Sequence, residues 1–286
     1  MQLEKFEQLI QSVNDAQMVL VGLGEEWIVT EEMIESDLEE KDVGLQQMFR
    51  MSRNVEKYQK VLPIFMSYYY QNYIPTKIEK AYQNMRDLLE EKNYFVVSLS
   101  VDSYLRKTGF KEDRYVNPCG TYEKLQCENG CRTELVSADE LLGEIESILV
   151  ETNDRDCHDE KIIYLLEKCL NVLENYHCEQ CGAPMSFNLL DTKKYCEEGY
   201  LEQWKKYMKW LQGTLNRELC VIESGVGVKH PSVIRWPFEK TVFYNQKAKM
   251  FRIHKMLYQV NEEVAERAYG CKCHSVDLFS ERNVKA

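Results

Sequence analysis

The chain has 286 residues, of which 44% are hydrophobic and 29% are charged, with 13 glycines and 6 prolines. This composition excludes a disordered, collagen-like or low-complexity chain, and the length suffices for one large domain or two modest ones. The 47 acidic residues outnumber the 36 lysines and arginines, giving a net charge of -11. This balance argues against a nucleic-acid partner, because affinity for phosphate backbones comes mainly from clustered cations.

The chain shows neither a secretory signal nor a membrane span. Residues 1–17 are charged and helix-patterned rather than basic and then apolar, and no run of about 18 apolar residues occurs. Eleven cysteines, an odd number in a long chain without a signal, favour reduced thiols, some of them on a metal, over a disulfide framework. We therefore expect a soluble, cytoplasmic protein.

The first third of the chain is predicted to contain two buried strands separated by helices. An amphipathic helix over 3–13 precedes an apolar run over 18–24 that ends in Gly-x-Gly, which indicates a strand and a tight turn. Residues 31–91 are helical in composition and are divided by two prolines; the stretch 78–89 has apolar residues at helical spacing. A second strand is predicted over 94–101.

The remainder begins with a cysteine-rich, turn-rich region over 117–200, in which we expect helices near 137–149 and 161–174. A strongly amphipathic helix over 200–215 leads to the third strand. The third and fourth strands are predicted at 219–222 and 248–253.

Strands that alternate with helical segments predict an α/β fold of Rossmann type, a parallel sheet with helices on both faces. Ligands bind such sheets at the carboxyl ends of the strands. Four distant segments should converge there to form one cleft: 22–26, 98–102, 225–227 and His254. The predicted domains are a Rossmann-type domain (1–30, 74–118 and 201–286), a helical insertion (31–73) and a zinc-binding small domain (119–200).

Two close thiol pairs predict a metal site. Four thiolates form the closed tetrahedral shell that structural zinc prefers. The ligands would be Cys127, Cys131, Cys178 and Cys181. Gly130 and Gly182 allow the tight chain reversals that such knuckles need. A closed shell leaves no position for catalysis, so this zinc would be structural. The alternatives are four isolated buried thiols, or replacement of one thiol by His177.

A second cysteine motif, Cys271-Lys272-Cys273-His274, suggests either a further metal or redox site or a structural pair. Alternate residues of a strand point to the same face. A buried structural pair is the preferred interpretation.

Longer motifs are similar to those of a known family. Four features resemble the sirtuins, which are NAD-dependent protein deacylases. They are "NYFVVSLSVDSYLRKTGF" at 93–110, "ESGVGVKHPSVIRWPFEK" at 223–240, the early Gly-x-Gly strand and the cysteine pairs. The closest likeness is to the bacterial macrodomain-linked branch, which transfers ADP-ribose to protein. The resemblance implies a nucleotide ligand, NAD or ADP-ribose, and a protein substrate or partner.

The resemblance also implies roles for particular residues. The cofactor-binding positions would be Gly22, Gly24, Ser98, Ser100, Asp102, Gly225, Gly227 and His254. Asp102 would contact the nicotinamide amide, and Ser100 stands where the family has an Asn beside the nicotinamide ribose. His254 stands where an Asn would touch the adenine ribose; alternatively it is a satisfied surface histidine. Arg235 and Trp236 are interpreted as structural residues of the loop edge.

The catalytic set implied by the resemblance is Cys119, Asp102 and Ser100. Cys119 occupies the position of the family's catalytic base, a His, or a Gln in the ADP-ribosylating branch. A thiol takes up a proton near neutral pH only when its pKa is lowered. The alternatives for Cys119 are a replaced, inactive residue and a redox or nucleophilic thiol.

Glu26 stands where the family has the Ser that helps to hold the NAD diphosphate. A carboxylate about 5 Å from a phosphate costs on the order of 3 kcal/mol at an effective dielectric constant near 20. Alternatively, Glu25 and Glu26 face the positive end of a following helix and occupy the anion site themselves. The departures at Glu26, Ser100 and Cys119 favour a pseudoenzyme: a non-catalytic or weakly active scaffold that binds a nucleotide or protein. The alternative is an NAD-dependent protein deacylase or mono-ADP-ribosyltransferase.

Overall fold

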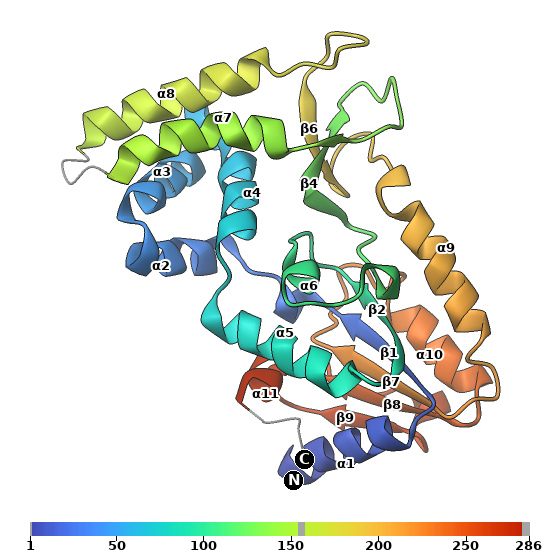
Figure 1. Cartoon of the computed structure of the whole chain (residues 1–286). Coiled ribbons are helices and arrows are strands. Elements are labelled where there is room, and N and C mark those ends of the chain that lie inside the picture. The colour runs from blue at the N-terminus through green and yellow to red at the C-terminus, as the bar shows by residue number, and fades with distance from the viewer. Residues whose placement is uncertain (1, 154–157, 282–286) are drawn as a thin grey trace. The chain divides into compact units, whose positions relative to one another are not determined.

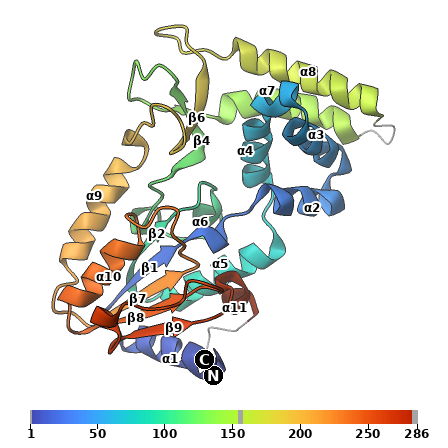
Figure 2. The ribbon, with the colours of Figure 1, turned by 180° about the vertical axis from the view of Figure 1, so that it is seen from behind.

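The computed structural model describes residues 2–153 and 158–281, so Cys157 lies outside the described residues. The chain forms two compact units (Figures 1 and 2). Unit 1 comprises Met1–Ile28, Pro75–Cys119 and Tyr200–Ala286, and unit 2 comprises Val29–Ile74 and Gly120–Gly199. The helical segment and the cysteine-rich segment therefore lie in the same unit. Across the described residues, we find no helix with the length and apolar character needed to cross a membrane.

Unit 1 is built on a six-stranded sheet in the order β3-β2-β1-β7-β8-β9, and every neighbouring pair is parallel. The strands are β1 (Met18–Leu23), β2 (Asn93–Ser98), β3 (Tyr115–Val116), β7 (Leu219–Ser224), β8 (Ala248–Ile253) and β9 (Ala268–Cys271). All residues of β1 and β7 are buried, as expected for central strands covered on both faces. The predicted α/β sheet and its four predicted strands are confirmed.

The structure corrects the extent of the sheet at two places. β2 ends at Ser98 rather than at residue 101, because the Ser100 N–H turns to the Ser98 hydroxyl, at 3.1 Å, and leaves the ladder. β3 and β9 were not predicted. They have only two and four residues, too few for a recognisable apolar period.

Helices cover both faces of this sheet; Figures 1 and 2 show α5 and α10 on opposite sides of it. The helices are α1 (Gln2–Asp15), α5 (Thr76–Leu89), α6 (Tyr104–Lys107), α9 (Glu198–Gln212), α10 (Arg235–Tyr244) and α11 (Ser275–Glu281), with 3₁₀ turns η1 (Glu25–Trp27), η3 (Glu112–Arg114) and η5 (Glu262–Val264). The predicted apolar face of α5 is confirmed, since its six apolar positions are all buried. The amphipathic face predicted for α9 is wrong in part. The helix ends before Gly213, and Met208 and Leu215 are 41% and 62% exposed.

Unit 2 combines helices with a small antiparallel sheet in the order β5-β4-β6. Its helices are α2 (Glu31–Lys41), α3 (Val43–Asn54), η2 (Glu56–Val61), α4 (Leu62–Asn72), α7 (Asp139–Leu149), η4 (Val150–Asn153) and α8 (Asp159–Asn175). Its strands are β4 (Gly120–Cys127), β5 (Val136–Ser137) and β6 (Met185–Leu189). The two helices predicted in the cysteine-rich region are confirmed, whereas its sheet was not predicted.

Candidate functional site

The four-cysteine cluster of unit 2 consists of Cys127, Cys131, Cys178 and Cys181, whose sulfur atoms all lie within 4.8 Å of one another. Sγ of Cys127 is 3.5 Å from Sγ of Cys181, and Cys131 and Cys178 are at the same separation. A zinc ion with Zn–S bonds near 2.3 Å places its tetrahedral sulfurs about 3.8 Å apart. The donor set and its spacing therefore fit a closed Zn–S₄ site.

The backbone around the cluster is shaped as a pair of knuckles. The N–H groups of Gly130 and Gly182 donate to the carbonyls of Cys127 and Cys178, at 2.9 and 2.8 Å, with positive φ at both glycines. Backbone N–H groups stabilise two of the thiolates: that of Cys131 lowers the pKa of Cys127 to about 6, and that of Gln180 lowers the pKa of Cys178. The pKa of Cys131 is instead raised to about 12, mainly by its hydrogen bond with the Cys178 sulfur. Lowered pKa values favour the thiolate form that binds metal.

The other predicted metal candidates behave differently. His177 is exposed and does not belong to the four-cysteine cluster. The structure therefore does not support replacement of a thiol by His177. Sγ of Cys271 lies 3.4 Å from Sγ of Cys273, with Cys271 buried and Cys273 half-buried. These two residues are a close thiol pair at the end of β9, and neither belongs to the four-cysteine cluster.

The carboxyl edge of the unit 1 sheet consists of the loops that follow β1, β2, β7 and β8. Backbone hydrogen bonds join these loops: Leu99 N–H donates to Leu23 O, Gly24 N–H to Ser224 O, and Gly225 N–H to Ile253 O, at 2.8 to 2.9 Å. The structure thus brings together the four sequence segments that were expected to converge.

Two glycines make this approach possible. A Cβ atom on Gly24 would stand 2.3 Å from the Cα atom of Val226, so no larger residue fits between the loops after β1 and β7. Gly225 has φ of +66°, a conformation that favours glycine, and its added Cβ would meet Glu26 at 2.5 Å. Both predicted glycines therefore hold the loops close together.

The carboxylates of Glu25 and Glu26 are bound to backbone N–H groups of other loops at this edge. Glu25 accepts the N–H of Gly227 at 2.5 Å and that of Lys229 at 3.2 Å. Glu26, whose side chain is 5% exposed, accepts the N–H of Lys255 at 3.0 Å and that of Ser275 at 2.7 Å.

The structure corrects the prediction that these two carboxylates face the helix that follows them in the chain. Ser275 is the first residue of α11, so Glu26 lies at the amino end of that helix, far along the chain. The N–H groups of Gly227 and Lys229 belong to the loop after β7, which contains the predicted cofactor-binding positions Gly225 and Gly227. Two carboxylates therefore occupy amides that would be suited to an anionic ligand.

His254 is buried, with 7% of its surface exposed, so the surface position offered for it as an alternative is wrong. Its Nδ1 accepts the N–H groups of Met256 and Leu257, at 2.9 and 3.0 Å. An accepting Nδ1 carries no proton, and burial lowers the pKa of His254, although the nearby Glu26 opposes this shift. The imidazole is neutral and holds the loop that offers the Lys255 N–H to Glu26.

The Ser98, Ser100 and Asp102 segment is internally hydrogen-bonded. The Ser100 hydroxyl donates to Oδ2 of Asp102, whose Oδ1 accepts the N–H of Tyr104 at 2.9 Å. The two serines are buried, and Asp102 is half-buried. The carboxylate is therefore held in one orientation at the edge of the sheet, while its contact with a nicotinamide stays a prediction.

Cys119 is buried, with 6% of its surface exposed, at the end of a unit 1 segment. Two residues earlier, the Asn117 side chain donates to the Ser100 carbonyl oxygen at 2.8 Å and attaches this segment to the loop after β2. The structure thus brings the segment that carries Cys119 to the carboxyl edge. Its role as a base stays a prediction.

A buried ion pair next to the carboxyl edge was missed by the sequence analysis. Arg252 on β8 forms a two-pronged pair with Glu223 on β7 and donates to Glu239 on α10 at 2.7 Å. The side chains of Glu223 and Arg252 are 0% and 4% exposed. The available signal was one acidic residue, Glu223, in the run of β7 and two basic residues, Lys249 and Arg252, in that of β8. Arg235 and Trp236, predicted at the loop edge, are instead the first two residues of α10. Arg235 donates to the Leu257 carbonyl oxygen, which supports a structural role, whereas Trp236 is 54% exposed.

Comparisons with known proteins agree with this architecture. No family model matches the chain. It is 22% identical over 202 residues to a protein ADP-ribosyltransferase of Staphylococcus aureus, covering 68% of this chain and 58% of that protein. It is 26% identical over 162 residues to a probable bifunctional ADP-ribose hydrolase/ADP-ribosyltransferase of Fusarium oxysporum f. sp. cubense, covering 56% of this chain and 25% of that protein. The chain therefore spans less than two thirds of both relatives.

Solved structures match over nearly the whole chain. A Sir2 homologue in complex with ADP-ribose has a TM-score of 0.54 and 11% identity, covering 98% of this chain and 96% of that one. A Sir2 homologue in complex with NAD has a TM-score of 0.51 and 11% identity, covering 96% and 91%. At such low identity these similarities establish the fold. The chain therefore has the fold of the Sir2 structures, together with a four-cysteine cluster that could form a zinc site.

Proposed function

We propose that this protein is a sirtuin-like scaffold that is non-catalytic or weakly active. In this proposal, the carboxylates of Glu25 and Glu26 fill the site where the family binds the NAD diphosphate. The observation that carries this proposal is the set of four backbone N–H groups donated to Glu25 and Glu26. Under this proposal unit 1 is the Rossmann-type domain, and unit 2 is a small domain held by structural zinc.

A phosphate entering this edge would lie beside two carboxylates and would have to displace them from their amides. One carboxylate at about 5 Å disfavours a phosphate by on the order of 3 kcal/mol at an effective dielectric constant near 20, roughly a hundredfold in affinity. Ser100 and Cys119 add to the case, because a hydroxyl lacks the paired donor and acceptor of an amide and a buried thiol is a poor base.

The test removes the two carboxylates and measures ligand binding. In the Glu25→Ala/Glu26→Ser variant, the amides become available and one family-like hydroxyl is restored. We expect ADP-ribose to bind this variant at least a hundredfold more tightly than it binds the natural chain, as measured by calorimetry. The matched control is Glu90→Ala/Glu91→Ser, which removes the same charge from an exposed acidic pair of unit 1 and should change nothing.

Turnover provides the second measurement. Nicotinamide release from NAD should be absent or very slow in the natural chain, with circular dichroism confirming that all variants are folded. Steady nicotinamide release by the natural chain, or equally tight ADP-ribose binding by the natural chain and the Glu25/Glu26 variant, would overturn the proposal.

The second candidate function is an NAD-dependent protein deacylase or mono-ADP-ribosyltransferase. It is favoured by the sequence similarity to the Staphylococcus aureus enzyme and by the fixed orientation of Asp102. In this case NAD would be the cofactor, Asp102 and Ser100 would contact the nicotinamide side, and Cys119 would act near the acceptor. Protein labelling from biotinylated NAD that disappears in Asp102→Asn and persists in the Glu90/Glu91 control would support it.

A further inference from the structure

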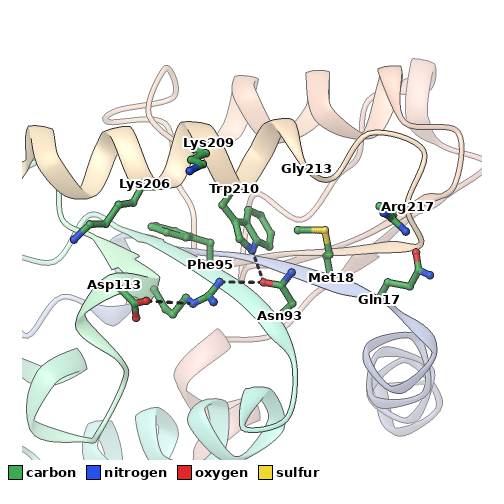
Figure 3. A pocket seen from close by; sticks show the side chains of 11 residues that line it. Gln17, Met18, Asn93, Phe95, Asp113, Lys206, Lys209, Trp210, Gly213 and Arg217 are labelled. Carbon is green, nitrogen blue, oxygen red and sulfur yellow. Dashed lines mark hydrogen bonds and ion pairs between the residues drawn. The ribbon is translucent and has the colours of Figure 1, made fainter.

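A pocket of about 760 Å³ lies at the opposite, amino edge of the unit 1 sheet (Figure 3). It is bordered by the first residues of β1 and β2 and by the last turns of α9 and the loop after it. No residue of the carboxyl edge lines it. It is therefore separate from the region to which the proposed function refers.

The charged residues that line this pocket are mostly basic, although the whole chain carries a net charge of -11. Four are cations (Arg114, Lys206, Lys209 and Arg217), and Asp113 is the single carboxylate. Lys206 is partly engaged by Glu202 on the same helix, at 2.9 Å. Lys209 and Arg217 have no ion-pair partner among the residues that the structure describes. Two exposed cations are thus available to an anion from solution.

The floor of the pocket is aromatic and fixed. The Trp210 indole N–H donates to Oδ1 of Asn93 at 2.7 Å, and the same oxygen accepts Nη1–H of Arg114 at 3.0 Å. The Trp210 ring lies 5.9 Å from the ring of Phe95, at 47°. Figure 3 shows Trp210 reaching down between Phe95 and Met18, with Lys206 and Arg217 toward the two ends. Because these groups are already hydrogen-bonded and packed, ligand binding would require little ordering.

We propose that this pocket binds a small organic anion that carries a planar ring. Cations around an aromatic floor match such a ligand, since the charges attract its phosphate or carboxylate and the indole provides a flat apolar surface. Arg114 is oriented by two neighbours, since its Nη1 donates to Asn93 and its Nε lies 3.8 Å from Oδ2 of Asp113, so Nη2 is the group that would donate to a bound anion.

The experiment uses calorimetry with the full chain and three probes: AMP (ring and phosphate), phthalate (ring and carboxylates) and ribose 5-phosphate (phosphate without an aromatic ring). We expect at least one ring-bearing probe to bind at least tenfold more tightly than ribose 5-phosphate. Tighter binding of AMP identifies the natural ligand as a phosphate, and tighter binding of phthalate identifies it as a carboxylate.

The Lys209→Gln/Arg217→Gln variant should weaken this binding at least tenfold. Lys205→Gln/Lys240→Gln removes the same charge from two exposed positions outside the pocket and should leave it unchanged. Binding should also persist in the Glu25→Ala/Glu26→Ser variant with Lys209 and Arg217 intact, which separates this proposal from the proposed function. Absence of binding by both ring-bearing probes at millimolar concentration, no advantage of the ring, or equal binding by the pocket and control variants would overturn the proposal.

Discussion

The four-cysteine cluster of unit 2 and the carboxyl edge of unit 1 were both predicted from sequence motifs, but the structure contains different parts of the two predicted sites. In the cluster, the ligand side chains themselves are present and their sulfurs lie within 4.8 Å of one another. At the carboxyl edge, the backbone is present: Gly24 and Gly225 bring the loops together, while the backbone amides there are bound by the carboxylates of Glu25 and Glu26.

This difference shows that the backbone of a binding site can persist while the side chains that would bind the ligand differ. Packing constrains the glycines at the carboxyl edge, because any Cβ atom on Gly24 would collide with the next loop. No such constraint acts on the polar side chains there, which can change as long as the amides find acceptors. In the cluster, by contrast, the four side chains would themselves be the ligands of the predicted metal. We therefore expect changes in the two regions to have very different consequences.

Loss of one cluster thiol should have the largest effect. Structural zinc sites contribute on the order of 10 kcal/mol of apparent binding free energy, so Cys178→Ser should prevent unit 2 from folding stably. We expect loss of bound zinc by elemental analysis, and rapid proteolysis within 29–74 and 120–199. A chelator should have the same effect on the natural chain.

The matched control for this prediction is Cys196→Ser. Cys196 is a half-buried thiol of the same unit, outside the cluster, that donates to the Thr133 carbonyl oxygen at 3.1 Å. It should retain zinc and protease resistance. A Cys178→Ser protein with a full complement of zinc and natural stability would refute the assignment of the cluster as a metal site.

The second largest effect is expected at the buried pair of unit 1. Arg252→Met would leave Glu223 charged and without its partner in the sheet, at a cost of about 3–5 kcal/mol in the free energy of unfolding. Burial already raises the pKa of Glu223. A carboxyl group whose pKa is raised in the folded state favours folding as it takes up a proton, so this variant should regain stability as the pH falls.

Urea unfolding measures this prediction, and the double variant Glu223→Gln/Arg252→Met is its control. Without the charge on residue 223, most of the loss should be recovered. Equal destabilisation of the single and double variants would show that lost packing, rather than an unpaired charge, causes the effect.

The four-cysteine cluster and the carboxyl edge also show which features can be predicted from a sequence. The cysteine pairs and the α5 face were predictable because their patterns are local, with partners three or four residues apart or at helical spacing. The partners of Glu25 and Glu26 lie 202 to 249 residues away, and Arg252 meets Glu223 only through the register of β7 and β8. Such contacts depend on the assembled sheet, so local patterns predicted the strands but not these hydrogen bonds.

The smallest predicted effect concerns the pH dependence of the carboxyl edge. His254 has a lowered pKa because it is buried; Glu26 and Glu25 oppose this shift, and Arg235 and Lys255 reinforce it. The unfolded chain therefore takes up a proton near pH 6.5 before the folded chain does. His254 should contribute its full stability above pH 6.5, and this contribution should be lost as the pH falls below that value.

His254→Asn tests this prediction, since an amide oxygen can accept the same two backbone N–H groups and does not titrate. Between pH 7 and pH 5.5, urea unfolding should show a steeper loss of stability for the natural chain than for this variant. His230→Asn, which replaces a half-buried histidine of the loop after β7, should retain the natural slope. A parallel loss of stability in the natural chain and in His254→Asn would contradict the prediction. It would show that the neutral imidazole does not hold the loop whose Lys255 N–H donates to Glu26.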